Sequence, residues 1–151
     1  MAERVTRATL GAWVLKANPN IIWDVHGDRD RGGHVASWHL HASYRVALIE
    51  VGDPVLLWVT RDHARGRPAG FYGSGAVTQL PRADDVDVDD PDEVGRWELG
   101  VAVDYLDEPV TKDELLARGL GTIEVIRAPR VGNPSYLTSE EATVVREFIR
   151  E

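Results

Sequence analysis

The five histidines are the residues of this 151-residue chain whose type and spacing most readily suggest chemistry. His39 and His41 would share one face of an extended segment, and His26, Asp28 and His34 precede them. The sequence has no helical H-x-x-x-H pair, and no carboxylate stands at a recognised metal-ligand spacing. We therefore expect exposed loop histidines and no metal ion. A hydrolytic enzyme that uses His39 or His41 is the weakest functional hypothesis.

The glycine-rich and acidic stretches lack the residues that known chemical motifs require. A nucleophile elbow around Ser74 needs glycines where Tyr72 and Ala76 stand. The stretch "DDVDVDDPDE" (84–93) begins like a calcium loop, but a loop starting at Asp85 reaches Arg96 where an EF-hand needs glutamate. We expect no cofactor and no catalytic activity.

Composition and charge are those of one folded domain, residues 1–151, without cysteine. No segment approaches the ~18–20 apolar residues of a membrane span, and the start has no signal-peptide run. We therefore expect a cytoplasmic protein with no membrane partner. The net charge of −8 is uneven, because seven acids lie within 84–93 and residues 1–82 carry ten bases against seven acids. Bulk charge therefore does not predict duplex binding, although a local basic face remains open.

The elements that must position any site are mainly strands. "AWVLK" (12–16) predicts a strand that ends at Asn18-Pro19, because proline cannot continue a ladder. Further strands are predicted at 51–60, 69–80, 96–106 and 121–126. Helices are predicted at 111–119 and from 138 to the end, each opened by a capping box, Thr111 with Glu114 and Thr138 with Glu141. The sum is an α+β fold built on a small β-barrel.

Several stretches together resemble the EVE domain, a branch of the PUA-like barrels related to the YTH readers of methylated adenine. The stretches, which span nearly the whole chain, are "WVLKANP" (13–19), Trp38 with Tyr44-Arg45, "VGDPVLLW" (51–58), "AGFYGSGAV" (69–77) and "IRAPRVGNPSYLTSEEA" (126–142). The resemblance implies a PUA-like mixed β-barrel with short flanking helices and a C-terminal helix. It also implies a non-catalytic reader that takes a modified base of DNA or RNA, such as methylated cytosine or adenine, into an aromatic-lined pocket.

Carried onto this sequence, the resemblance implies a set of ligand-binding and phosphate-binding residues. The ligand-binding candidates are Asn18, Trp23, Trp38 and Asn133. The phosphate-binding candidates are Arg61, Arg65, Arg67 and Arg130. Trp38 is the best candidate for a stacking wall, because it lies among histidine and serine instead of an apolar run.

Each candidate also has a purely structural interpretation. Asn18 and Asn133 precede prolines, where an asparagine often only shapes a turn. Trp23 follows two isoleucines and can pack beneath the turn, and the arginines of 61–67 can belong to a solvated hairpin tip. The tryptophans expected in the core are Trp13, Trp58 and Trp97.

Two classes of function therefore remain open beside the weak hydrolase hypothesis. The leading one is a modified-base reader for single-stranded or flipped-out bases, for which a partner nuclease is a compatible associate. The alternative is a small-molecule-binding or protein-interaction module on a PUA-like barrel, because the acids of 84–93 would repel phosphates over a Debye length of ~8 Å. The oligomeric state is left open by the sequence.

Overall fold

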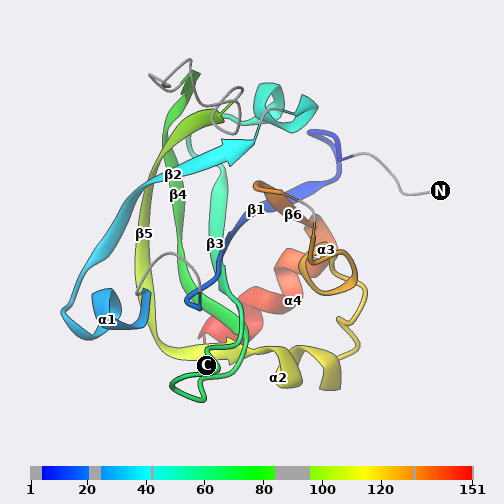
Figure 1. Ribbon diagram of the computed structural model, residues 1–151. Helices are drawn as coiled ribbons and strands as arrows, with labels where there is room; N and C mark the ends of the chain where they lie inside the picture. Colours follow the sequence, from blue (N-terminus) through cyan, green and yellow to red (C-terminus); the bar gives the residue numbers. More distant parts are fainter. Residues whose placement is uncertain (1–4, 21–24, 42, 84–95, 131, 151) are drawn as a thin grey trace.

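The computed structural model describes residues 5–20, 25–41, 43–83, 96–130 and 132–150. These residues form a six-stranded mixed sheet with the strand order β2-β5-β4-β3-β1-β6 (Figure 1). The strands are β1 (Leu10–Ala17), β2 (His34–His41), β3 (Pro54–Val59), β4 (Gly70–Ala83), β5 (Arg96–Thr111) and β6 (Ser135–Thr138). The helices are α1 (Val25–Asp30), the 3-10 helix η1 (Tyr44–Leu48), α2 (Lys112–Ala117), α3 (Glu124–Arg127) and α4 (Ser139–Arg150).

The sheet has a hydrophobic core on each face. β1 runs parallel to β3 and antiparallel to β6, so β1 lies inside the sheet and is buried on both sides. Along β1, Ala12 and Val14 belong to the core that the sheet shares with α2 and α4, here called the helix-side core. Trp13 and Leu15 belong to the core on the opposite face of the sheet, here called the concave-side core. The near-continuous apolar run of this strand follows from that two-sided burial.

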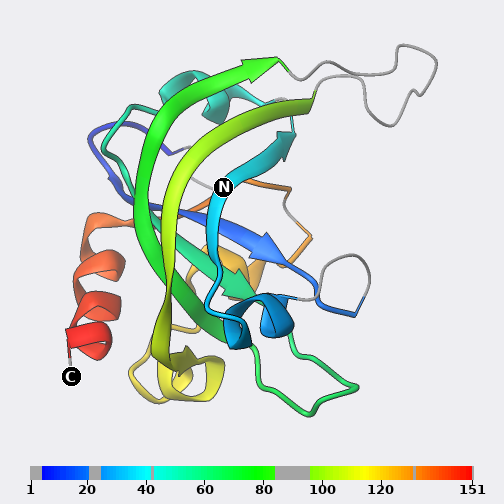
Figure 2. The same cartoon turned by 90° about the vertical axis from the view of Figure 1, so that its left-hand side faces the viewer.

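The long hairpin of β4 and β5 bends strongly and gives the sheet its curvature (Figure 2). Glycines permit the close approach of the two strands: a Cβ atom on Gly75 would overlap the carbonyl oxygen of Ala102. The strand predicted at 69–80 is confirmed as part of β4.

The predicted barrel is not closed. β2 and β6 are the two ends of the strand order and do not pair with each other in the described residues. β6 has only four residues, and all four pair with β1. The strand is therefore too short to continue to β2 and close the barrel. A backbone hydrogen bond of 3.1 Å from His41 N to Asn133 O joins the end of β2 to the segment before β6. The α+β class is correct, and the closure is the part that was wrong.

A second correction concerns 121–126, which was predicted to be a strand and contains the start of helix α3. Short apolar runs do not distinguish strand from helix by periodicity alone. Here the tertiary contacts decide, because Ile123 and Val125 pack in the helix-side core while the Glu124 carboxylate binds Arg45. The short strand β6 was not predicted.

Other local predictions are confirmed. Glu141 N donates to Thr138 Oγ1 and Thr138 N donates to Glu141 Oε1, at 3.2 and 2.9 Å, which is the complete capping box of α4. At α2, Thr111 Oγ1 accepts from Glu114 N at 3.2 Å, which is one of the two hydrogen bonds of a capping box. The tryptophans expected in the core behave as predicted: Trp13 and Trp58 are buried, and Trp97 is half-buried against the concave-side core.

Candidate functional site

A pocket of about 530 Å³ occupies the place where the sheet fails to close. It is lined by all eight residues of β2, by Lys16, Ala17 and Asn18 at the end of β1, and by Asn133. Three of the four predicted ligand-binding residues, Asn18, Trp38 and Asn133, therefore lie around one cavity. The fourth, Trp23, lies outside the described residues, as does the acidic stretch 84–93.

The edge strand β2 presents Trp38 to this pocket. Val35 and Leu40 are buried, although strict alternation along a strand would place them on opposite faces. The pairing of β2 with β5 shifts register between Val35 and Ser37, and Trp38 therefore lies on the same face as both and packs against the concave-side core. Trp38 is only half-buried, because β2 pairs with β5 on one side and the pocket lies on the other. A half-buried aromatic ring held by a paired strand is a preorganised surface for stacking.

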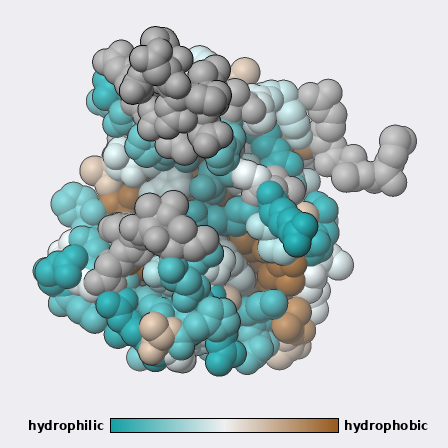
Figure 3. All heavy atoms as spheres, in the orientation of Figure 1, coloured by the Kyte–Doolittle hydropathy of each residue, from teal (hydrophilic) through white to brown (hydrophobic). Residues whose placement is uncertain are grey.

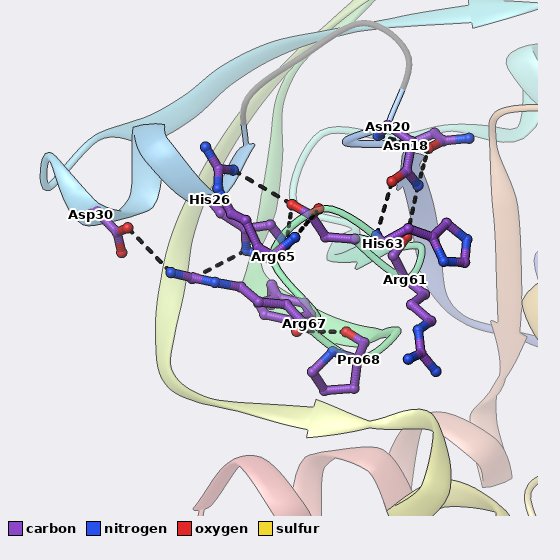
Figure 4. Close-up of polar contacts among 11 residues, drawn as sticks. Asn18, Asn20, His26, Asp30, Arg61, His63, Arg65, Arg67 and Pro68 are labelled. Atoms are coloured by element: carbon purple, nitrogen blue, oxygen red, sulfur yellow. Dashed lines mark hydrogen bonds and ion pairs between the residues drawn. The ribbon is translucent and has the colours of Figure 1, made fainter.

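The side chain of Asn18 shapes the turn that closes one end of the pocket. Its Oδ1 accepts hydrogen bonds from the Asn20 backbone N at 3.0 Å and from Asn20 Nδ2 at 2.9 Å. Asn20 in turn donates to the carbonyl of Arg61 at 2.7 Å and accepts from His63 N at 3.0 Å, as Figure 4 shows. Asn20 therefore fastens the turn to the β3–β4 loop, 61–68. It was not among the predicted residues, although its place in Asn-Pro-Asn was a signal.

Asn133 is bound to the backbone of β1. Lys16 N donates to Asn133 Oδ1 at 2.7 Å, and Asn133 Nδ2 donates to Lys16 O at 3.3 Å. Its amide thus replaces a strand partner at the point where β6 has not yet begun. This structural role differs from the turn-shaping role considered for Asn133, because the amide bonds a distant strand and not its own turn.

Lys16 supplies a positive charge that the sequence analysis did not single out. Its Nζ donates to the carbonyl of Pro129 at 3.0 Å, and burial lowers the pKa of the ammonium, with Glu124 opposing and Arg45 reinforcing that shift. Its position at the end of the first predicted strand, beside Asn18, was the available signal.

A buried ion pair lies behind the pocket. Arg45 Nη2 donates to Glu124 Oε2 at 2.7 Å, and Ser135 Oγ donates to Glu124 Oε1 at 2.8 Å. Burial alone would raise the pKa of Glu124, but the hydrogen bonds from Arg45 and Ser135 outweigh it and the pKa is lowered. Arg45 belongs to the "YR" pair quoted for the family resemblance, and its role here is structural.

The four predicted phosphate-binding arginines divide into two groups. Arg65 and Arg67 lie in the β3–β4 loop and form ion pairs with Asp62 and Asp30 at 3.5 and 3.4 Å (Figure 4). Arg61 and Arg130 are exposed, and neither guanidinium has a carboxylate partner within the described part of the chain. The exposed pair is therefore better placed than Arg65 and Arg67 to meet a phosphate.

Neither Arg61 nor Arg130 is among the residues that line the pocket, but the backbone at or next to each contacts the region at the end of β1. The Arg61 carbonyl accepts from Asn20, next to Asn18, and Arg130 follows Pro129, whose carbonyl accepts from Lys16. The face of the molecule shown in Figure 3 is largely hydrophilic, with small separated hydrophobic patches. Contacts made on that face would therefore be mainly polar.

The histidines are spread over several sites. We expected exposed loop histidines, and this is only partly correct: His39 and His41 are exposed but lie on strand β2, and His26 is buried in helix α1. No cluster of three or more His, Asp or Glu suited to a metal ion occurs among the residues that the structure describes. None of the helices within the described ranges is long and apolar enough to cross a membrane.

Comparisons with known proteins show the fold. No family model matches the sequence, and no curated protein matches it. The DUF55 domain of human thymocyte nuclear protein 1 is 13% identical, with a TM-score of 0.62 over 91% of this chain and 98% of that one. A hypothetical protein from Leishmania major is 19% identical, with a TM-score of 0.65 over 95% and 98%. Rpa0253 from Rhodopseudomonas palustris is 15% identical, with a TM-score of 0.64 over 93% and 94%.

The fold of these structural neighbours can be compared with the fold that the family resemblance predicted. At identities of 13–19% these likenesses show a shared fold, and one of the neighbours is a DUF55 domain. The α+β class is confirmed with an open sheet, and the assignment to the PUA-like barrels stays a prediction. Membership of the EVE family itself stays a prediction.

Proposed function

We propose that this chain is a non-catalytic nucleic-acid-binding domain whose pocket between β2 and the end of β1 receives a single modified base. The observation that carries the proposal is the half-buried Trp38 beside a pocket of about 530 Å³. That volume is within the range of roughly 300–1,000 Å³ found for small-ligand sites. The predicted PUA-like architecture is consistent with nucleic-acid binding.

Stacking on Trp38 supplies the affinity in this proposal. Every base offers a flat π-face, and stacking on an aromatic side chain contributes ~1–3 kcal/mol per base. The ring lies on a strand paired to β5 through the Trp38–Leu99 register, so little of that energy is lost in ordering the side chain. A base must leave its helix to reach such a pocket, which favours single-stranded or flipped-out targets.

Arg61 and Arg130 supply the phosphate contacts. Both are exposed, and the backbone at or next to each accepts a hydrogen bond from the region at the end of β1: Asn20 donates to the Arg61 carbonyl, and Lys16 donates to the Pro129 carbonyl. A strand that inserts one base would therefore carry its flanking phosphates toward exposed guanidinium groups. Each such contact releases counterions, so binding should weaken as salt rises.

The test is fluorescence anisotropy of short labelled DNA and RNA strands that carry one modified base or its unmodified counterpart. We expect Trp38→Ala to weaken binding by about 5- to 150-fold, the equivalent of one lost stacking contact. Trp97→Ala is the matched control, because Trp97 is also half-buried and packs on the same core but does not line the pocket. Equal losses in both variants would refute the proposal.

A small-molecule or protein-interaction module is the second candidate function, and the edge of β2 favours it. Beyond β5, β2 has no further strand partner in the described residues, and its whole length lines the pocket. An extended peptide can pair with such an edge through backbone hydrogen bonds. Binding of this kind would be insensitive to salt, which separates it from binding through phosphates.

A further inference from the structure

The hydrogen bonds around the pocket fix the orientation of its two asparagine amides, and from that orientation we infer what kind of base it selects. We propose that the pocket recognises a base carrying an oxygen acceptor, such as a formyl or carboxyl group, in preference to one carrying only a methyl group. The inference rests on the proposed function and names its substrate class.

Asn18 is an exposed residue of the pocket lining, and its amide oxygen is already engaged. Its oxygen is assigned without ambiguity, because the backbone N of Asn20 can only donate and lies 3.0 Å from Asn18 Oδ1. A second bond from Asn20 Nδ2 uses the same oxygen. Within the described residues Asn18 Nδ2 has no protein acceptor, so an N–H group is what this side chain offers to a ligand.

Asn133 is fixed in the same way by the backbone of Lys16. Lys16 N donates to Oδ1 and Lys16 O accepts from Nδ2, so neither atom can be exchanged with the other. One of the two Nδ2 hydrogens is used by Lys16 O. The second hydrogen remains available at the pocket rim.

The charged residues around the pocket also favour a ligand that carries an acceptor. The pocket lining includes Lys16, whose ammonium donates to the carbonyl of Pro129, and among the described residues it contains no aspartate or glutamate. The nearby Glu124 is held by Arg45 and Ser135. The histidines of β2 carry ring N–H groups, and none of the lining side chains in the described part of the chain is a fixed anionic acceptor.

Such a lining discriminates between modified bases by whether the added group can accept a hydrogen bond from the lining. An oxygen acceptor on the base can pair with the Asn18 N–H, and a carboxylate also gains charge-assisted bonding near Lys16. A methyl group pairs with neither, so it gains no hydrogen bond from the lining. The resulting order of affinity should be carboxyl, then formyl, then hydroxymethyl, then methyl.

The test uses single-stranded DNA with one cytosine that carries each of these four groups at C5, and anisotropy on the full chain. We expect the carboxyl strand to bind about tenfold or more tightly than the methyl strand. Asn18→Asp keeps the oxygen that Asn20 requires but replaces the N–H donor by an anionic acceptor. We expect this variant to lose the preference for carboxyl, while Gln79→Glu, an exposed amide-to-acid exchange on β4, keeps it.

The outcomes separate the inference from the function on which it rests. If Trp38→Ala weakens binding but the four strands bind the wild type equally, or the methyl strand binds best, the inference is overturned and the proposed function stands. An unchanged order in Asn18→Asp also overturns it. Absence of binding to every strand overturns both.

Discussion

Two tryptophans of the concave-side core lie in opposite surroundings. Trp13, on the inner strand β1, is 0% exposed, and its Nε1 donates to Asp53 Oδ2 at 2.9 Å. Asp53 also accepts from Arg7 and from Glu50 N, so the indole N–H of Trp13 belongs to a buried hydrogen-bond network. Trp38, on the edge strand β2, is half-buried and borders the pocket.

The difference follows from strand position and not from residue type. A strand inside the sheet is covered on both faces and both edges, so its aromatic side chain is enclosed and its polar neighbours must be satisfied internally. On an edge strand, one side of an aromatic residue stays uncovered by the sheet and can contact a ligand. We therefore expect substitutions around Trp13 to affect stability, and substitutions around Trp38 to affect binding.

The largest effect should come from Trp13→Ala. Removal of a buried tryptophan costs about 3–5 kcal/mol, and the loss of the Trp13–Asp53 hydrogen bond adds to it. Trp38→Ala should cost less than half as much, because part of the ring is already in water. Urea unfolding of both variants measures the free energies of unfolding, and equal losses would contradict the comparison.

Arg45→Ala should be the next most damaging change. It leaves the Glu124 carboxylate buried and without its cation, which typically costs about 3–5 kcal/mol. Arg118→Ala is the matched control, because Arg118 pairs with Glu147 at 2.9 Å on the surface, where the cost is about 0–1 kcal/mol. Thermal and urea unfolding of the two variants compare these costs, and a similar loss in both would mean that burial of the Arg45 pair contributes nothing.

Local patterns in the sequence were enough to predict much of the region around Trp13. The apolar run at 12–16 and the two capping boxes depend on neighbouring residues, so they could be identified before any tertiary contact was known. The helix at Glu124 and the open sheet could not, because both depend on contacts between distant segments. Arg45 is 79 positions from Glu124, and no local pattern connects them.

The candidate site shows the same division. Trp38, Asn18 and Asn133 were predicted from the family resemblance, and the structure places them around one pocket. The details that give the site its chemistry were not predictable, since Asn133 binds a backbone 117 positions away. Asn20 and Lys16 were missed for the same reason: their importance arises only when the turn and the end of β1 meet other segments.

Asn133→Ala should have a smaller, structural effect. Lys16 would lose both backbone hydrogen bonds to the amide, and part-buried groups left unpaired cost about 1–3 kcal/mol. Asn18→Asp should change the free energy of unfolding by about 0.5 kcal/mol or less, since the turn keeps its acceptor oxygen. Urea unfolding measures the loss of stability in each variant. A larger loss in Asn18→Asp than in Asn133→Ala would mean that the Asn18 amide matters more for stability than the Asn133 amide.

The smallest expected effect concerns His26, an interior residue whose polar atoms are incompletely satisfied. Its Nδ1 lies 3.4 Å from Arg67 Nη1, its Nε2 lies 3.9 Å from Asp62 Oδ2, and Nε2 has no hydrogen-bond partner within the described residues. Burial lowers the pKa of His26, and the positive charge of Arg67 lowers it further, with Asp62 opposing. The folded state therefore holds this imidazole neutral at pH values where the unfolded chain, with an ordinary pKa of about 6.5, already binds a proton.

The sign of the pH dependence follows from that difference. Because the unfolded state binds more protons below about pH 6.5, the free energy of unfolding should fall as the pH drops from 7.5 to 5. The pKa values of the buried carboxyls Asp53 and Glu124 are lowered, so their contribution is lost only at more acidic pH. His26→Gln should flatten the dependence in this window, whereas His63→Gln, an exposed histidine of the neighbouring loop, should leave it unchanged. Equal slopes in the wild type and His26→Gln would show that the interior tolerates a charged His26, and that its partly satisfied polar groups cost the fold nothing.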